Sequence, residues 1–287
     1  MEAITQGYET EVTLPTPTRI GYNFLGWYLE SDADTLYNET ISMPLNGAKL
    51  LASWEIVTYT ITLDENGGES VEDVSGHYQD ELVLPTPTRV GYTFAGWYEG
   101  NTKYTEEVME ARNIELTAKW LANTYTVVFN SNNGTEETKE QTFTFDAEAV
   151  SLTKNTFTKT GYTFAGWATE QDSNVVVYED EKEVKNLTSD ANGLVELYAV
   201  WTANTYTVTF DANGGEGEMN SQEFVYGVSE TLDANAFTRT GYTFLGWNTA
   251  KSATVATYND QDAVSTLSAA VNGKVTLYAV WAINQYT

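Results

Sequence analysis

A seven-residue motif recurs four times along the chain, and its period limits the folds that the chain can adopt. GYTFAGW occupies residues 91–97 and 161–167, and near copies stand at 21–27 and 241–247. A second tryptophan closes each unit, so all eight tryptophans fall into two series. Repeats of this period predict tandem small domains, rather than the two domains of about 150 residues that the length alone suggests. The two series are Trp27, Trp97, Trp167 and Trp247 in the motif, and Trp54, Trp120, Trp201 and Trp281 at the close of each unit.

Each complete unit has the same order of predicted elements. It begins with an alternating strand such as TYTVTF, in which Tyr206, Val208 and Phe210 share one face. A turn such as DENGG or DANGG follows, and Asn-Gly between alternating segments predicts a hairpin because both central residues need a positive φ. The unit continues with a returning strand, a crossing segment, the motif, a polar loop and a final strand that ends in tryptophan.

The final strand has one apolar face in every unit, and two units need a cover on the other face as well. In LYAVW at 197–201, leucine, alanine and tryptophan share one face, whereas tyrosine and valine lie on the other. Repeats 3 and 4 are also about ten residues longer just before this strand. There Val184, Leu187 and Ala191 recur at helical spacing, i, i+3 and i+7, as do Val264, Leu267 and Val271. This spacing predicts short helices at about 181–188 and 261–270.

Strict alternation along the motif separates two sets of side chains. It places Tyr92, Phe94 and Gly96 on one face of the strand and Thr93, Ala95 and Trp97 on the other. Gly91 is expected to permit a turn, Gly96 to leave room beside a large ring, and Trp97 to pack near Trp120 or the hairpin. The residues predicted to form the structural core are the eight tryptophans together with Tyr92, Phe94, Tyr162, Phe164, Tyr242 and Phe244.

The register of the motifs predicts where each unit begins and ends. Repeat 1 (1–57) lacks its first strand, repeat 2 (58–122) is of the short type, repeats 3 (123–203) and 4 (204–283) are of the long type, and 284–287 begin a further repeat. Residues 1–13 align with the second strand of the later units. We therefore expect a fragment of a longer array; the alternative is that repeat 1 is an atypical cap with another edge, such as MEAITQ at 1–6.

The order YTVTFDANGG, FTRTGYTFLGWNT and VTLYAVW resembles the Listeria–Bacteroides repeat, also called the internalin B-repeat, over nearly the whole chain. The resemblance implies a ubiquitin-like β-grasp module, found in tandem on bacterial surface proteins, with no catalytic residues to carry over. The expected class is α+β, mostly β. If the first and last strands are parallel neighbours, as the resemblance implies, the short linkers predict an elongated array of about 110 Å, from modules of roughly 28 Å. Repeats 1 and 2 depart from the pattern with LPTPTR before the motif, and Ser53 and Lys119 replace the valine of LYAVW.

Composition excludes several classes of function. The chain has 14 basic and 41 acidic residues, a formal charge of −27, which repels nucleic acid and anionic lipid. Cysteine is absent, so disulfides, thiolate zinc sites and cysteine nucleophiles are excluded. No apolar run of about 18 residues predicts a membrane span, and the first ten residues have no signal-peptide pattern.

The sequence gives little indication of a catalytic or metal-binding site. His77 has no counterpart in the other units, no carboxylate pair recurs beside a nucleophile, and DENGG and DANGG have too few spaced oxygens for a calcium loop. A basic residue recurs two positions before the motif glycine, with either an anion contact or a stem packed over an aromatic ring as its role. We favour the stem. Its four members are Arg19, Arg89, Lys159 and Arg239.

The aromatic residues could form a sugar-binding platform or a core. Burial of a large side chain contributes about 1.5–3 kcal/mol, so five registered rings contribute roughly 8–15 kcal/mol before costs. A domain of about 70 residues without cysteine or metal needs most of that. The sequence therefore favours a non-catalytic spacer of a bacterial surface protein, extracellular, monomeric and without cofactors or metals. Its expected partners are neighbouring repeats, with no nucleic acid and no membrane insertion; the second hypothesis is an adhesin that binds a host surface protein or glycan.

Overall fold

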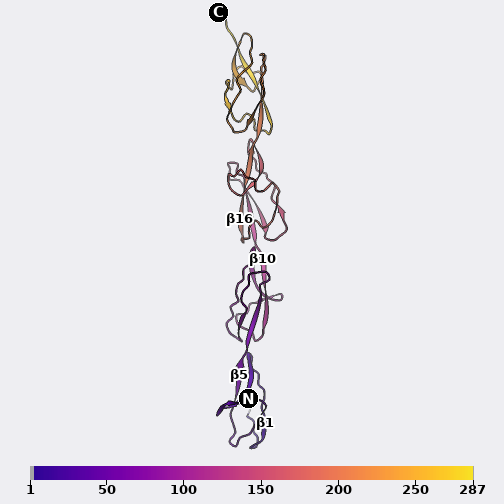
Figure 1. Cartoon of the computed structure of the whole chain (residues 1–287), viewed down its shortest axis with the longest axis vertical. Helices are drawn as coiled ribbons and strands as arrows, with labels where there is room; N and C mark the ends of the chain where they lie inside the picture. Colours follow the sequence, from indigo (N-terminus) through magenta and orange to yellow (C-terminus); the bar gives the residue numbers. More distant parts are fainter. Residues whose placement is uncertain (1–2, 287) are drawn as a thin grey trace. The chain divides into compact units, whose positions relative to one another are not determined.

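The computed structural model describes residues 3–286. The chain forms two compact units, Met1–Asn123 and Thr124–Thr287. The first holds the sheets of repeats 1 and 2, and the second holds those of repeats 3 and 4 (Figure 1). The predicted beginning of a further repeat at 284–287 and the alternative edge at 1–6 fall partly on residues 287 and 1–2, which lie outside the described range.

The sheet of repeat 3 has its first and last strands side by side at its centre. Its order is β12-β11-β16-β14, with β11 (Thr124–Asn130) parallel to β16 (Gly193–Ala203) and antiparallel to β12 (Thr138–Thr144). β14 (Tyr162–Ala168) carries the motif and is antiparallel to β16. Because the first and last strands are parallel, the chain enters the repeat at one end of the sheet and leaves it at the other. Repeat 4 has the same arrangement, with β18 (Gln222–Val225), β17 (Thr205–Asp211), β22 (Gly273–Ile283) and β20 (Tyr242–Asn248) in that order.

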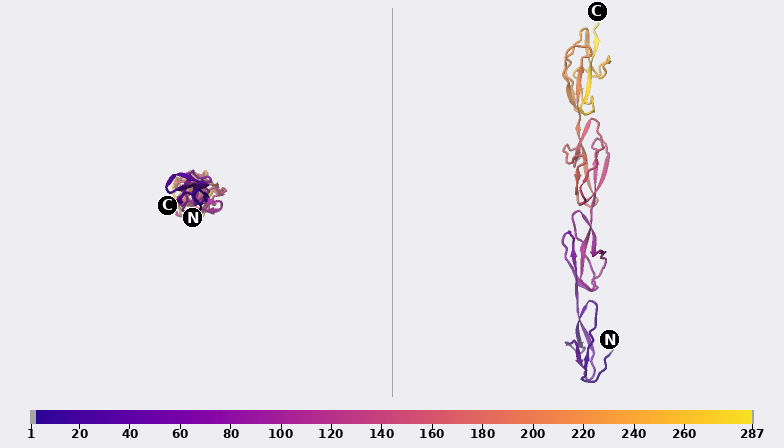
Figure 2. Two further views of the ribbon diagram at one scale, coloured as in Figure 1. Left: turned by 90° about the horizontal axis from the view of Figure 1, so that it is seen from below. Right: turned by 90° about the vertical axis from the view of Figure 1, so that its right-hand side faces the viewer.

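Repeats 1 and 2 differ from this pattern at their edges. Repeat 2 keeps the central parallel pair and adds a short strand beside the motif strand, whereas in repeat 1 the last strand pairs with the motif strand alone (Figures 1 and 2). The order in repeat 2 is β7 (Val74–His77), β6 (Thr58–Asp64), β10 (Ile114–Ala122), β8 (Tyr92–Glu99) and β9 (Thr102–Lys103). The order in repeat 1 is β3 (Asp32–Tyr37), β2 (Tyr22–Leu29) and β5 (Leu50–Ile56).

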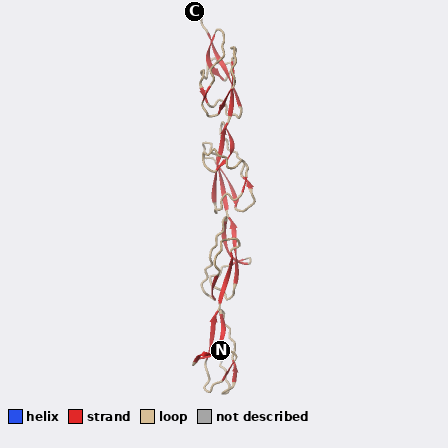
Figure 3. Cartoon of the chain, in the orientation of Figure 1, coloured by secondary structure: helices blue, strands red, loops and turns tan. Residues whose placement is uncertain are grey.

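The predicted helices are absent from the described residues, which form only strands, turns and loops (Figure 3), so the expected α+β class is wrong and the modules are all-β. Both segments are extended and form two-residue ladders with the segment before the crossing. β15 (Glu183–Val184) pairs with β13 (Val150–Ser151), and β21 (Ala263–Val264) pairs with β19 (Glu230–Thr231). In repeat 1 the corresponding ladder joins β1 (Glu11–Thr13) to β4 (Thr40–Ser42).

Polar groups explain why the apolar spacing at 181–188 does not produce a helix. Asn186 has a φ of 52°, and its side chain makes two hydrogen bonds with Asp146, at 2.7 and 2.9 Å. The amide of Leu187 donates to the hydroxyl of Tyr125 at 3.3 Å. These bonds across the repeat replace the i to i−4 bonds of a helix, since asparagine competes for local backbone conformations outside helices. Val184 is buried and Leu187 is partly buried against the core, so the predicted apolar contacts form from an extended chain.

The Asn-Gly turns of repeats 2 and 4 have the predicted backbone but do not close two-residue hairpins; in repeat 3 the positive φ falls on Asn132 and Gly134 instead of Asn133 and Gly134. Asn66 and Gly67 have φ of 48° and 86°, and Asn213 and Gly214 have 47° and 89°. The β6–β7 pairing nevertheless begins only at Ile61 and Val74. Each turn therefore lies at the end of a longer loop rather than directly between paired residues.

The motif strand contains a β-bulge, which corrects the prediction of strict alternation. In repeat 2, Phe94 lies opposite Trp120 and Trp97 lies opposite Ala118, with the register shifted between Lys119 and Trp120. Because Ala118 and Trp120 share one face of β10, Phe94 and Trp97 also share that face, instead of the opposite faces that alternation predicts. The same shift occurs between the motif phenylalanine and glycine in the other three repeats.

The motif glycine is required by this bulge. Gly246 has a φ of 133°, and a Cβ there would lie 2.3 Å from the carbonyl oxygen of Tyr258 and 2.8 Å from the side chain of Ala256. In repeat 3, the loop residues Val176 and Tyr178 crowd Gly166 in the same way. Gly166 lies opposite Val200, which is buried. The loop after the motif therefore passes over the second apolar face, where a helix was expected, and the glycine leaves room for a loop rather than for a ring.

We predict that Gly246→Ala destabilises repeat 4 much more than Gly241→Ala does. Both glycines have positive φ, but a Cβ at Gly241 would meet nothing within 4 Å. Gly241→Ala should cost about 1 kcal/mol from backbone strain, and Gly246→Ala about 2 kcal/mol more from the clash with backbone. Hydrogen exchange of the β22 amides measures the difference, and equal losses would contradict the steric role of the bulge.

Candidate functional site

Each repeat contains a cluster in which the motif phenylalanine lies between the two tryptophans. In repeat 2 the ring centroid of Phe94 is 5.5 Å from that of Trp97 and 5.4 Å from that of Trp120, both edge-to-face. Phe164 and Phe244 hold the same position, with centroid distances between 4.9 and 5.6 Å. Phe24 completes the series in repeat 1. The proximity expected for Trp97 and Trp120 is thus mediated by Phe94, and such ring pairs are favourable beyond their burial.

The two tryptophan series have different surroundings. The motif tryptophans are at most 7% exposed, and those of repeats 3 and 4 are at most 1% exposed. The closing tryptophans are only partly buried. So are the motif residues Tyr92, Tyr162, Tyr242, Phe94, Phe164 and Phe244. The deepest part of each core thus combines the motif tryptophan with the first strand, where Tyr125 and Tyr206 are at most 1% exposed.

The closing tryptophan is hydrogen-bonded to the Asn-Gly turn. Its indole N–H donates to the carbonyl of the residue before the asparagine, at 2.9 Å in repeats 2, 3 and 4. The asparagine side chain in turn donates to the carbonyl of the alanine two positions before the tryptophan. These donors are Asn66, Asn132 and Asn213, at 3.2, 3.0 and 2.9 Å from Ala118, Ala199 and Ala279. The turn therefore joins the first strand to the end of the last, a role that the turn pattern alone did not indicate.

The recurring basic residue packs on the motif tyrosine three positions later. The guanidinium carbon of Arg89 lies 3.9 Å from the ring centroid of Tyr92, and the other three members lie 3.7 to 4.7 Å from their rings. Arg89 also donates to the carbonyl of Asn66 at 3.1 Å. The charged head, and not only the stem, thus contacts the ring and the turn, an arrangement typical of cation–π packing.

The motif tryptophans differ in how their indole N–H groups are satisfied. Trp27 and Trp97 donate to the carbonyls of Pro15 and Pro85, both at 2.8 Å. Repeats 3 and 4 lack these prolines, and Phe157 and Phe237 instead pack edge-on against Trp167 and Trp247. Within residues 3–286 the buried N–H groups of Trp167 and Trp247 have no hydrogen-bond partner. The LPTPTR variant therefore exchanges an aromatic contact for a hydrogen bond.

Ionisable side chains form only local contacts. His77 Nδ1 lies 3.2 Å from Asp80 Oδ2, and both side chains are substantially exposed. No group of three histidine, aspartate or glutamate side chains within residues 3–286 is placed to hold a metal ion. In repeat 2, Arg112 bridges Glu99 and Glu110. Burial, together with the carboxylates of Glu110 and Glu106, raises the pKa of Tyr104 to about 12. These contacts join loop segments of repeat 2 and bring no nucleophile next to a base.

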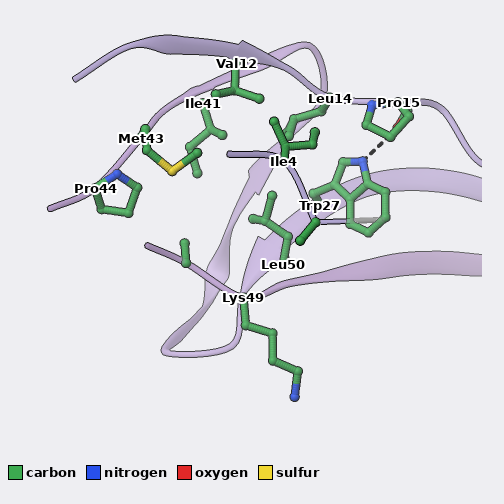
Figure 4. Close-up of a pocket in the computed structure, with 12 residues that line it drawn as sticks. Ile4, Val12, Leu14, Pro15, Trp27, Ile41, Met43, Pro44, Lys49 and Leu50 are labelled. Carbon is green, nitrogen blue, oxygen red and sulfur yellow. Dashed lines mark hydrogen bonds between the residues drawn. The ribbon is translucent and has the colours of Figure 1, made fainter. Parts of the chain in front are cut away.

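An apolar pocket of about 470 Å³ lies in repeat 1, on the side of the sheet where β5 is the edge strand (Figure 4). Ile4, Leu14, Trp27 and Leu50 point into it, and Lys49 points away. Its volume and lining are in the range of ligand sites. The other lining side chains include Val12, Ile41 and Met43. The sequence did not predict this pocket, and of the predicted core residues only Trp27 lines it.

Four modules, three of them built on a central parallel strand pair and all on a Trp–Phe–Trp cluster, define a tandem-repeat β protein. The chain belongs to the Listeria-Bacteroides repeat domain family, whose model matches residues 2–52, 59–119, 125–200 and 206–280. The family resemblance in the sequence is thereby confirmed. Residues 3–286 include no helix with the length and apolar character of a membrane span.

The chain is also similar to segments of longer proteins. A provisionally named Gly-rich membrane protein of Evansella cellulosilytica is 33% identical over 300 residues, which cover 98% of this chain and 32% of that protein. A second provisionally named membrane protein of that organism is 30% identical over 94% of this chain and 40% of its own length. Internalin H of Listeria monocytogenes is 37% identical over 129 residues, 42% of this chain and 23% of that protein. The chain thus spans well under half the length of these relatives.

We predict that Trp97→Ala lowers the stability of repeat 2 by about 3–5 kcal/mol, because it removes a buried ring that packs against Phe94. Leu121→Ala, at a side chain that is 67% exposed, should change stability by at most about 0.5 kcal/mol. Hydrogen exchange of the β6 and β10 amides provides the measurement. If Trp97→Ala left exchange unchanged but abolished binding of a ligand, the motif would be a site rather than a core.

The Arg112 contact gives a prediction about pH. Arg112 donates to both oxygens of Glu99, at 2.5 and 2.9 Å, and these bonds lower the pKa of Glu99 below its ordinary value of 4.5. The resulting stabilisation is present above the pKa of the unfolded chain and is lost as pH falls through the lower folded-state pKa. Arg112→Gln should raise the pKa of Glu99 toward 4.5 in a carboxyl NMR titration. Lys49→Gln, in repeat 1, is the control that should leave the titration of Glu99 unchanged.

Proposed function

We propose that this chain is a non-catalytic spacer within a bacterial cell-surface protein, extracellular in location, which holds another part of that protein away from the cell. The observation that carries the proposal is the parallel pairing of the first and last strands in repeats 2, 3 and 4. Each such repeat passes the chain from one end of its sheet to the other. A series of them adds length with every unit, which is what a spacer requires.

The junctions between successive repeats support the spacer proposal, because they are short. One residue separates the last strand of each repeat from the first strand of the next: Val57, Asn123 and Asn204. Asn204 is 8% exposed, and its side chain accepts from Thr163 at 2.6 Å and donates to the carbonyl of Ala269 at 2.8 Å. Its backbone also bonds Gly161 and Tyr226. A junction that is hydrogen-bonded on both sides restricts bending between repeats 3 and 4.

Tyr226 adds a packed aromatic contact to the same junction. Its ring lies against Gly161, where a Cβ would be 2.1 Å from two ring carbons, and its centroid is 5.9 Å from that of Tyr162. In the first unit, Tyr78 lies against Gly21 in the corresponding way. The glycines that open the motifs of repeats 1 and 3 thus also receive a ring of the following repeat, and we propose that neighbouring repeats are the main partners of each module.

The relatives and the surface charge fit this proposal. Two relatives are named as membrane proteins and one as an internalin. A formal charge of −27 favours solubility and opposes binding to nucleic acid or insertion at anionic lipid. We therefore propose a monomeric spacer without catalytic function or cofactor.

A second candidate function is direct adhesion to a host glycan or protein. It is favoured by one surface feature of repeat 3, where Val175, Val176 and Val177 are 68%, 39% and 49% exposed in the loop after the motif. Repeat 4 has valine, alanine and threonine at the corresponding positions. An exposed apolar feature that one repeat has and its neighbour lacks is what a specific contact surface would require.

We further propose that the module is a β-grasp fold in which the helix is replaced by extended chain. The sheet orders β12-β11-β16-β14 and β18-β17-β22-β20 place the first and last strands at the centre, parallel to each other. The segments that a helix would occupy are instead the ladders at Glu183–Val184 and Ala263–Val264. An experimental structure of repeat 3 superposed on ubiquitin-like domains tests this assignment.

The spacer proposal predicts an extended particle in solution. A compact chain of 287 residues has a radius of gyration near 19 Å, whereas four modules in series give about 30 Å or more. Small-angle X-ray scattering of the full chain measures this quantity, and a value near 19 Å would contradict the proposal. In parallel, saturable binding to a glycan array that Val175→Ser abolishes would favour adhesion, with Val255→Ser in repeat 4 as the matched control.

A further inference from the structure

The parallel pairing of the first and last strands decides how a repeat responds when the chain is pulled. In repeat 3 the chain enters at the beginning of β11 and leaves at the end of β16, and these two strands are neighbours. A pull on the chain therefore draws β11 back toward its beginning and β16 forward toward its end. The two strands can separate only by sliding past each other, so the hydrogen bonds between them are loaded together instead of one after another.

The bonds that resist this sliding form a ladder between the first and last strands. The ladder has six residue pairs in repeats 3 and 4 and four in repeat 2. In repeat 3 it runs from Tyr125 to Asn130 along β11. The amide of Asn192 adds a further bond at the entry end, to the carbonyl of Thr124 at 2.8 Å. The resistance of a repeat to a pull should therefore increase with the length of its ladder.

The turn after the first strand extends the ladder with side-chain bonds. Asn132, two residues past β11, donates to the carbonyl of Ala199 at 3.0 Å, and the indole of Trp201 donates to the carbonyl of Ser131 at 2.9 Å. Ala199 and Trp201 both follow Tyr198, the last residue of β16 that is paired with β11. Sliding moves the turn away from these two partners, so both bonds are loaded in the same direction as the ladder.

Other hydrogen bonds of the repeat lie outside the loaded strand pair. The side chain of Gln141, in β12, accepts from the amide of Thr153 at 2.8 Å and donates to the carbonyl of Ser151 at 2.9 Å. These bonds join the outer strand to the segment before the crossing, and neither partner belongs to β11 or β16. They remain intact while β11 begins to slide against β16, although they contribute to the stability of the folded repeat.

We propose that repeats 2, 3 and 4 bear tension along the chain, and that the two bonds between the turn and the last strand belong to the set that carries the load. The proposal rests on the spacer function, because a spacer is pulled when the part that it holds away from the cell becomes attached. The resistance itself arises from the strand pair within each repeat. It can therefore be measured apart from the spacer function.

The first test pulls repeat 3 in two directions within the full chain. The chain has no cysteine, so DNA handles attach only at cysteines that are introduced. Thr124→Cys with Thr202→Cys, both at exposed positions, places the handles at the entry and exit and makes the strands slide. Thr124→Cys with Leu194→Cys, where Leu194 is 71% exposed, places both handles at one end and opens the ladder pair by pair. Magnetic tweezers at constant force should give an unfolding rate at least about tenfold lower in the sliding geometry, because several bonds break together.

The second test removes one bond of the turn. Asn132→Gly deletes the donor to Ala199, and glycine adopts the φ of 43° at this position without strain. The unfolding rate should rise about fivefold in the sliding geometry. It should stay within about twofold in the opening geometry, because there the turn lies at the far end of the ladder and separates last.

Gln141→Ala is the matched control in the same repeat. It also removes side-chain hydrogen bonds, those to Ser151 and Thr153, and should lower the stability of repeat 3 in denaturant. It should nevertheless change the unfolding rate in the sliding geometry by less than about twofold, because these bonds are not broken when β11 first slides against β16. A role of Asn132 in stability alone would give the two variants the same effect under force.

Repeat 2 offers a comparison in which no hydrogen bond is removed. Thr58→Cys with Leu121→Cys places the handles at its entry and exit, at an exposed threonine and a leucine that is 67% exposed. Its ladder has four pairs instead of six. At the same force, repeat 2 should unfold faster than repeat 3 in the sliding geometry.

Equal unfolding rates of repeat 3 in the two geometries would overturn the proposal. So would an effect of Asn132→Gly that is the same in both geometries or is matched by Gln141→Ala, or a repeat 2 that resists force longer than repeat 3. An extended particle in X-ray scattering with equal rates in the two geometries would leave the spacer proposal standing and refute this one. A compact particle with rates that depend on direction would do the reverse.

Discussion

The bulge at the motif glycine is the constraint on which the rest of each repeat depends. It shifts the register of the motif strand by one residue. The motif phenylalanine and tryptophan therefore face the same core instead of opposite sides of the sheet. Only then can the phenylalanine ring contact both tryptophans and connect the motif to the closing strand. The glycine has a positive φ in every repeat, and in repeats 3 and 4 the backbone that passes over it leaves no space for a side chain. The four copies of the motif are therefore four copies of a structural requirement.

The second connection in each complete repeat is polar and links the two ends of the sequence unit. The Asn-Gly turn follows the first strand, whereas the tryptophan and alanine that it bonds belong to the last strand. The basic residue before the motif covers the same turn and stacks on the motif tyrosine. First strand, crossing segment and last strand are thus held at one point, which explains why these residue types recur in register although they are far apart in the sequence.

Differences between the repeats show what the module tolerates. The carbonyls of Pro15 and Pro85 accept from the motif tryptophans of repeats 1 and 2. In repeats 3 and 4 phenylalanine rings pack on the motif tryptophans, whose buried N–H groups have no partner within residues 3–286. A buried unpaired donor is costly, so the added ring contacts have to offset that cost. Repeat 1 retains its Trp–Phe–Trp cluster without a parallel first strand. The same cluster therefore forms in all four repeats.

The sequence by itself determined the number of units, the alternating first and last strands, the positive φ of the Asn-Gly turns in repeats 2 and 4, and the family. These features are periodic or local, so they can be recognised in the sequence without knowing which segments are in contact. Only the tertiary structure decided the faces of Phe94 and Trp97, because a bulge breaks the period of two on which alternation depends. It also decided that Val184 and Leu187 reach the core from an extended chain: their spacing fits a helix, but the bonds of Asn186 to Asp146 and of Leu187 to Tyr125 come from residues about 40 and 60 positions away. Contacts at such separation leave no local pattern in the sequence.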